Sequence, residues 1–161
     1  MKRYMFWIRG ILITLLAGWI CMLHFFSAQP AEESGSLSEG FCYRIAQITV
    51  ADFDTFSPAE QAEIVGKFQK PVRKTAHFCE YALGGLLVML LLNTFSLSSR
   101  VRWAFGAGFG LLNAALDELH QGFVAGRSPE VGDVLLDVCG VLCGMAVVWA
   151  IFWWRKKHTL R

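Results

Sequence analysis

The sequence predicts an all-α membrane protein with four transmembrane helices, chiefly because its charged residues are few and unevenly distributed. Hydrophobic residues make up 55% of the 161 residues, and charged residues make up only 17%. Stretches of about 20 residues carry almost no charge, and this is the length that a helix needs to cross a bilayer. We therefore expect one membrane domain over residues 1–161, with transmembrane helices at about 6–26, 76–95, 101–119 and 131–154 and an extracytoplasmic segment at 27–75.

The first apolar segment runs from Phe6 to Phe26 and follows two basic residues, Lys2 and Arg3. It approaches the length of a membrane span, whereas the apolar core of a signal peptide has roughly 7–15 residues. No A-x-A-like cleavage site follows it cleanly. We interpret it as a retained transmembrane helix in which the long side chain of Arg9 reaches the inner interface.

The segment that follows contains a helix-start motif of the form S-x-x-E, from Ser36 to Glu39. In this motif the two side chains bond the first free backbone N–H groups of a helix. Phe41, Ile45 and Ile48 then recur at helical spacing. They predict a short amphipathic helix that lies on the membrane.

A second S-x-x-E motif runs from Ser57 to Glu60 and has Pro58 at the favoured first helical position. It predicts another short helix. We expect this helix to end before Pro71, because proline has no N–H to continue the helical ladder.

The distribution of basic residues predicts the orientation. If there are four spans, many of the lysines and arginines fall on one side: Lys2, Arg3, Arg9, Arg100, Arg102, Arg155, Lys156, Lys157 and Arg161. Trp149, Trp153 and Trp154 form an aromatic belt next to the last of these basic groups. Because basic residues favour the cytoplasmic side, we expect both termini in the cytoplasm.

Glycine pairs spaced four apart occur inside two of the predicted spans, at Gly106 and Gly110 and at Gly140 and Gly144. Such pairs let helix backbones approach closely in lipid. We expect them to pack helices within one bundle, with homodimerisation as the alternative.

With this topology, the polar ends of the last three spans all point to the extracytoplasmic side. Several of their residues share a helix face, because they are three or four positions apart, as in His77 with Glu80 and Asp133 with Asp137. A charge at the bilayer centre costs at least about 2.5–3.5 kcal/mol, so these polar faces should meet in one outward-facing pocket. The candidate pocket residues are Gln29, Arg73, Lys74, His77, Glu80, Tyr81, Asp117, Glu118, Gln121, Arg127, Asp133 and Asp137.

The charges of this cluster do not balance, since its carboxylates outnumber its lysine and arginine side chains. A poorly hydrated site can relieve the excess by protonating His77 or His120, by protonating a carboxylate or by binding a cation. The sequence specifies no cofactor, but oxygen-rich ligands would suit a divalent cation such as magnesium, calcium or manganese. Alternatively, Arg73, Lys74 and Arg127 can hold the phosphate or carboxylate of a lipid.

Other classes of function have less support. The net charge is only +2, and no basic stripe with interleaved aromatic residues supports nucleic-acid binding. The five cysteines are an odd number with no CxxC pair, so they imply neither a disulfide framework nor a zinc site. Motifs of known hydrolases and phosphate-binding loops are missing, so the sequence leaves open whether the protein is an enzyme.

The polar segments form an ordered set of motifs: Phe26-Ser27-Ala28-Gln29, Arg73-Lys74-Thr75-Ala76-His77-Phe78-Cys79-Glu80-Tyr81 with Gly84, Asp117-Glu118-Leu119-His120-Gln121 with Phe123, and Gly126-Arg127 with Asp133, Asp137 and Gly140. In this order they resemble the VanZ-like family over nearly the whole chain. The resemblance implies a small protein of the bacterial cytoplasmic membrane, similar to one linked to low-level resistance to teicoplanin-type glycopeptides.

Three functional hypotheses follow. In the first, the protein reduces susceptibility to lipid-anchored glycopeptides through the outward pocket, with membrane lipids and a lipid-tailed glycopeptide or lipid-linked envelope precursor as partners. In the second, it is an enzyme acting on a lipid-linked phosphate or other envelope lipid, with His77 and Glu80 as acid and base and Arg73 and Arg127 binding the anion. In the third, it is a structural or accessory membrane subunit whose polar network only sets the helix register.

Overall fold

A computed structural model describes residues 2–159, and it is helical almost throughout, with no strand in that range. The elements are α1 (Lys2–Ser27), α2 (Ala31–Thr49), the short 3-10 helix η1 (Phe53–Thr55), α3 (Pro58–Asn93), α4 (Ser99–Gln121) and α5 (Val131–Thr159). Arg161, which contributes to the predicted orientation, lies outside the described residues. The expected all-α fold is confirmed.

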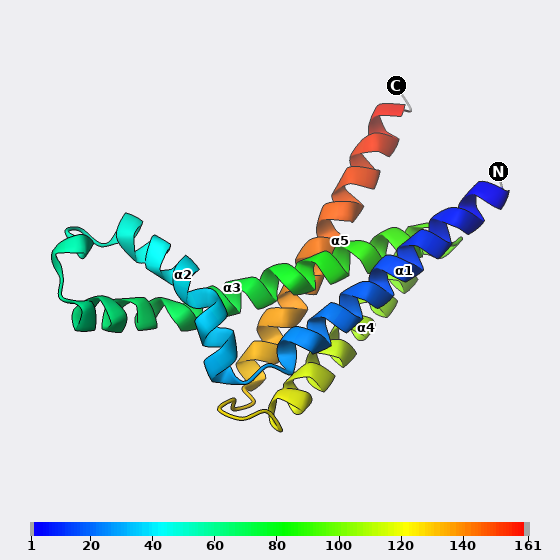
Figure 1. The fold of residues 1–161 in the computed structure, drawn as a ribbon. Coiled ribbons are helices and arrows are strands. Elements are labelled where there is room, and N and C mark those ends of the chain that lie inside the picture. The colour runs from blue at the N-terminus through cyan, green and yellow to red at the C-terminus, as the bar shows by residue number, and fades with distance from the viewer. Residues whose placement is uncertain (1, 160–161) are drawn as a thin grey trace.

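Three helices are long and apolar enough to cross a membrane, over Arg3–Ser27, Pro58–Asn93 and Val131–His158. The chain is therefore a multi-pass membrane protein. Figure 1 shows α1, α4, α5 and the second half of α3 as a bundle, with both termini at one end and the α4–α5 loop at the other. We call the end that carries Asp117 and Asp137 the acidic end, and the end that carries Arg9 and Arg102 the basic end.

The bundle packs around an apolar core formed by all four of its helices. Trp19 of α1, Val88 and Met89 of α3, Ala114 of α4 and Met145 of α5 are buried in it. Burial of such side chains against one another excludes lipid and solvent from the centre of the bundle.

Glycines allow α3 and α5 to cross with their backbones in contact. A Cβ atom at Gly144 would collide with the carbonyl oxygen of Ala82, and one at Gly85 would collide with that of Val141. Gly106 and Gly110 receive the side chains of Met145 and Val141 from α5 in the same way. The spaced glycines thus pack helices inside the bundle, as the sequence indicates.

The helix begun by Ser57 does not end before Pro71, and this part of the prediction is wrong. Ser57 and Glu60 do form the expected reciprocal cap, but α3 then runs unbroken from Pro58 to Asn93. Pro71 removes one backbone hydrogen bond. The helix nevertheless continues into the bundle, and the Thr75 hydroxyl donates to the Pro71 carbonyl at 2.9 Å one turn later. Residue 76, the expected start of the second transmembrane helix, therefore lies in the middle of α3 and is not the start of a helix.

The first S-x-x-E motif does not start a helix, which is a second correction. Helix α2 begins at Ala31 with Pro30 before it, and the Ser36 hydroxyl donates to the Glu33 carbonyl inside the helix. The reason is that the chain turns directly after α1, and the Pro30 carbonyl, six residues before Ser36, already accepts the first backbone hydrogen bond of α2 from the Ser34 N–H.

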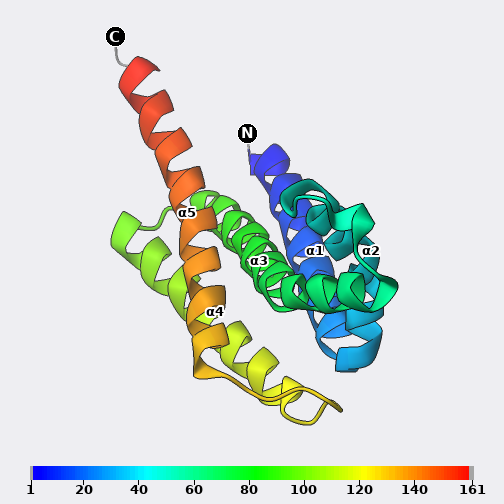
Figure 2. The same cartoon turned by 90° about the vertical axis from the view of Figure 1, so that its left-hand side faces the viewer.

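Helix α2 folds back on the first half of α3, and the two project from the bundle as a hairpin (Figure 1), which Figure 2 shows end-on. Cys42 and Ala46 of α2, Phe53 of η1 and Val65 of α3 are buried between them. The hairpin therefore has a small apolar core of its own, and this core lies on a different face of α2 from Phe41 and Ile48, which are exposed.

Candidate functional site

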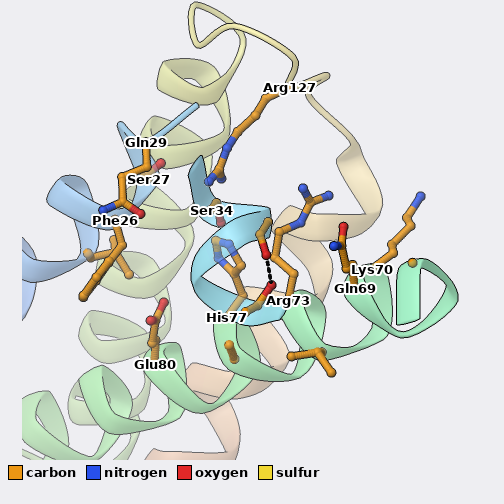
Figure 3. A pocket seen from close by; sticks show the side chains of 16 residues that line it. Phe26, Ser27, Gln29, Ser34, Gln69, Lys70, Arg73, His77, Glu80 and Arg127 are labelled. Atoms are coloured by element: carbon orange, nitrogen blue, oxygen red, sulfur yellow. Dashed lines mark hydrogen bonds between the residues drawn. The ribbon is translucent and has the colours of Figure 1, made fainter. Parts of the chain in front are cut away.

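A cavity of about 400 Å³ lies at the acidic end, where α1 gives way to α2 and where the α4–α5 loop approaches α3. Figure 3 shows Arg127 extending from that loop toward His77, with Arg73 and Glu80 on the neighbouring turns of α3. The polar residues that line the cavity are Ser27, Gln29, Ser34, Ser38, Gln69, Lys70, Arg73, His77, Glu80 and Arg127.

Helix α3 contributes the floor of this cavity. Arg73, His77 and Glu80 follow one another at spacings of four and three, which keeps them on one face of the helix. Trp19 of α1 holds α3 in place below them, because its indole N–H donates to the Glu80 carbonyl at 2.8 Å and its ring covers Gly84. The position of α1 therefore determines one wall of the site.

A more deeply buried polar group lies beside the cavity, between α3, α4 and α5. Asp117 is 0% exposed, and Asp137 is 2% exposed. Potential ligand atoms of His77, Asp117 and Asp137 all lie within 4.8 Å of one another. Gln121 Nε2 donates to Asp117 Oδ2 at 3.0 Å. One imidazole and two carboxylates at this separation can share a proton or hold a metal ion.

Several buried polar atoms at the acidic end have no hydrogen-bond partner among the residues that the structure describes. They are Ser27 Oγ, Tyr81 Oη, Asp117 Oδ1, Arg127 Nε and Nη1, and Asp137 Oδ1. Most buried polar atoms in proteins are satisfied, since leaving one unpaired costs about 1–3 kcal/mol. This concentration of exceptions at one place makes the acidic end the candidate site.

Arg127 is positioned by the loop rather than by a helix. Gly126 before it has a φ of 74°, a conformation that favours glycine. Burial, and then the positive charge of Arg73, lower the pKa of Arg127. An anion bound beside the guanidinium would relieve this electrostatic penalty.

Ion pairs fasten the α4–α5 loop to α3. Glu130 accepts from Lys70 at 3.1 Å and from Lys74 at 3.3 Å, and Lys74 also pairs with Asp133. The hydrogen bonds from Lys70 and Lys74 lower the pKa of Glu130. The backbone N–H of Glu130 donates to the Glu118 carboxylate, which joins the loop to α4.

The structure brings all the sequence-derived candidates to this end. Gln29, Arg73, His77, Glu80 and Arg127 line the large cavity. A smaller cavity next to it is lined by Arg73, Lys74, His77, Glu118, Gln121, Asp133 and Asp137. Tyr81 is buried between these groups and packs edge-on against Trp19, and Asp117 lies with His77 and Asp137. His120, by contrast, is exposed.

Sequence reasoning missed the wall contributed by α2 and the first half of α3. Ser34 and Ser38 are four apart on α2, and Gly66, Gln69 and Arg73 are spaced at three and four on α3. This periodicity of small and polar residues was a readable signal. His24 was also missed, and its Nδ1 atom lies 3.9 Å from Asp117 Oδ1.

Comparison with known proteins gives one match that covers most of the chain. The model of the family described as VanZ/LLP1 matches residues 12–153. No curated protein and no solved structure matches the chain.

Proposed function

The chain belongs to the VanZ/LLP1 family, and from this premise we propose that it reduces the susceptibility of a bacterial cell to lipid-tailed glycopeptides of the teicoplanin type. The pocket at the acidic end does this by binding the drug or a lipid-linked envelope precursor at the outer face of the cytoplasmic membrane. The observation that carries the proposal is the group of buried, unpartnered polar atoms around that pocket.

Helix α4 is the fourth span in this proposal. Its 23 residues extend about 34 Å at 1.5 Å per residue, which is enough to cross the hydrocarbon core. Phe105, Leu112 and Leu119 are exposed, while Asn113 and Asp117 are buried against other helices. An apolar outer surface around a polar interior is the arrangement that lipid requires.

The acidic end faces outward, and both termini lie in the cytoplasm. Arg9 and Arg102 are at the same end of the bundle as the termini, next to the basic residues that follow Trp154. The excess of lysine and arginine at that end supports a cytoplasmic location.

The hairpin of α2 and the first half of α3 lies on the outer membrane surface. Phe41 and Ile48 are exposed on α2, with Ile48 85% exposed, and face away from the hairpin's own core. Insertion of this face into the headgroup region would cover it and keep the hairpin beside the pocket entrance.

The lining of the pocket suits an amphipathic ligand. Arg73 and Arg127 offer guanidinium groups for an anionic head, whereas Leu23, Phe26 and Val72 offer an apolar wall for an acyl chain. A volume near 400 Å³ is within the usual range for a small-molecule site, about 300–1,000 Å³. It accommodates a head group or chain segment rather than a whole glycopeptide.

A susceptibility assay tests the proposal. Cells that express the wild type should tolerate more teicoplanin than cells with an empty vector. Glu80→Gln and Arg127→Gln should return them to the vector's susceptibility at equal protein levels in the membrane. Glu63→Gln and Arg44→Gln change the same residue types on the exposed hairpin and should leave protection intact. Equal protection by all four variants would mean that the polar network is only structural.

A second candidate function is an enzyme that acts on a lipid-linked phosphate. It is favoured by the presence of His77 and Glu80 in one cavity with Arg73 and Arg127, because an acid–base pair and an anion clamp are what phosphate chemistry uses. Purified protein in liposomes should then convert a polyprenyl phosphate or diphosphate. Unchanged lipid, with and without added divalent metal, would count against it.

A further inference from the structure

The acidic end also contains a set of metal-ligating groups whose use the proposed function leaves open. We propose that His77, Asp117 and Asp137 bind one divalent cation of the class that accepts both imidazole and carboxylate ligands, namely manganese or zinc. The three residues come from α3, α4 and α5, so such an ion would join the three helices that meet at this end.

The two carboxylates supply the first argument. Both aspartates are more than nine-tenths buried, and each has one oxygen, Oδ1, without a hydrogen-bond partner in the described part of the chain. His24 Nδ1 is 3.9 Å from Asp117 Oδ1, which is beyond hydrogen-bond distance. Two buried carboxylates this close repel each other unless a proton or a cation lies between them. A divalent cation neutralises both.

The geometry supplies the second argument. Ligand atoms bound at about 2.0–2.2 Å from one ion lie roughly 3–4.4 Å from one another. The candidate atoms of His77, Asp117 and Asp137 are within 4.8 Å of one another, which is only slightly wider than this range. Tyr81 Oη is buried and unpartnered beside them and can donate to a bound carboxylate.

The donor set decides the class of ion. Carboxylate oxygens alone would suit magnesium or calcium, but an imidazole ligand favours transition metals and zinc. One imidazole with two carboxylates fits manganese or zinc, and three protein ligands leave coordination positions open.

The open side of this ion would face the large cavity. His77 lines both that cavity and the smaller one that reaches Asp137. Arg73 lines both cavities as well, and Arg127 points in from the loop. An anionic oxygen held by these arginines would therefore lie next to the metal. The ion does not depend on the proposed protection against glycopeptides, and its test needs no drug.

Metal titration of the purified full-length protein in detergent is the direct experiment. After treatment with a chelator and its removal, Mn²⁺ is added and free Mn²⁺ is followed by electron paramagnetic resonance, with Zn²⁺ measured by elemental analysis. We expect one ion of either metal per chain. Asp117→Asn, Asp137→Asn and His77→Gln should each weaken Mn²⁺ binding by at least about 10–100-fold, because loss of even an outer-shell partner costs this much and these variants remove a direct ligand.

Two variants serve as matched controls. His120→Ala removes an exposed imidazole, and Glu130→Gln removes an exposed carboxylate at the same end of the bundle, so both should keep wild-type affinity. If either aspartate variant fails to fold, His77→Gln decides, since this side chain is only half-buried. The proposal would be overturned if the folded wild type did not retain one equivalent of Mn²⁺ or Zn²⁺. It would also be overturned if His77→Gln bound the metal as tightly as the wild type. Loss of protection against teicoplanin in cells would not affect it.

Discussion

The two ends of the bundle bury charge in opposite ways. At the basic end, Arg9 donates to the Thr94 hydroxyl at 3.1 Å and to the Thr94 carbonyl at 2.6 Å, and its guanidinium lies over the Phe95 ring. Arg102 donates twice to the Leu97 carbonyl, at 3.1 and 2.7 Å, and also to the Asn93 side chain. Arg9 satisfies a carbonyl group where α3 ends, which is where a helix dipole favours a positive charge, and Arg102 satisfies one in the loop that leads to α4.

At the acidic end several buried atoms stay unpaired. Tyr81, Asp117, Arg127 and Asp137 all have side-chain atoms with no partner within residues 2–159. Both ends pay a desolvation penalty, and the arginines of the basic end offset it with several hydrogen bonds within the chain, whereas the acidic end leaves part of its buried polar atoms without one. Charge near a helix end can therefore be purely structural, and buried polar atoms without partners in the described residues distinguish a candidate site from a helix cap.

The largest effect is expected where α3 and α5 cross, because this contact joins the two ends. Gly144→Ala should destabilise the protein by about 3 kcal/mol or more, since the added Cβ meets the Ala82 backbone and the helices must separate. Thermal unfolding in detergent measures the change. Gly108→Ala is the control, because nothing lies within 4 Å of its Cβ position, and it should be neutral or slightly stabilising. If the two variants melted at the same temperature, close contact between α3 and α5 at Gly144 would not be important for stability.

Loss of an arginine at the basic end should lower stability without affecting function. Arg102→Met removes the hydrogen bonds to Leu97 and Asn93 and should cost about 2 kcal/mol. Protection against teicoplanin per folded molecule should be unchanged. Arg100 is exposed, so Arg100→Met should leave the melting temperature where it is. A fall in protection beyond the fall in protein level would contradict a purely structural role for this end.

The reverse pattern is expected from Tyr81 at the acidic end. Tyr81→Phe removes a buried hydroxyl that has no partner, so stability should stay within about 1 kcal/mol of the wild type or rise. Protection should nevertheless decrease. Thermal unfolding and the susceptibility assay, performed on the same variant, measure the two quantities. A marked loss of stability would show that the hydroxyl is satisfied within the protein.

The smallest effect is expected from the ion pairs that hold the α4–α5 loop. Because Lys70 and Lys74 lower the pKa of Glu130, the carboxylate contributes stability above its ordinary pKa of 4.5, and this contribution is lost as the pH falls through the lowered value. Glu130 is exposed, so the contribution is small. Glu130→Gln should melt close to the wild type at neutral pH. In the wild type, backbone amide hydrogen–deuterium exchange in the α4–α5 loop should become faster as the pH falls and the ion pairs of Glu130 are lost. In Glu130→Gln this increase should be smaller.

Helical periodicity was enough to predict which residues gather at the acidic end. Asn113, Asp117 and Gln121 must share a face of any helix that contains them, and so must Asp133 and Asp137. An uninterrupted bundle with short loops then brings these faces to one end. The same reasoning showed that the spaced glycines permit close approach, but not that Gly144 meets Ala82, because the partner depends on how the helices pack.

The hairpin was harder to predict, since local rules and tertiary packing disagree there. Pro71 is a helix breaker by local chemistry, yet α3 continues through it because residues on both sides are held, in the hairpin core on one side and in the bundle on the other. Ser36 has the sequence of a cap but lies inside α2. The pocket wall made by Ser34 and Ser38 follows from that packing and could not be inferred from the motif.

The central claim is that the unpaired groups at the acidic end exist for binding and not for stability, and Asp117→Asn tests it most directly. Thermal unfolding of the purified variant in the presence of a chelator, and teicoplanin protection by cells with equal amounts of protein, are measured together with the wild type. We expect Asp117→Asn to melt at a temperature equal to or above that of the wild type and to lose protection. A lower melting temperature with protection retained per folded molecule would contradict it and would make Asp117 a structural residue like Arg102.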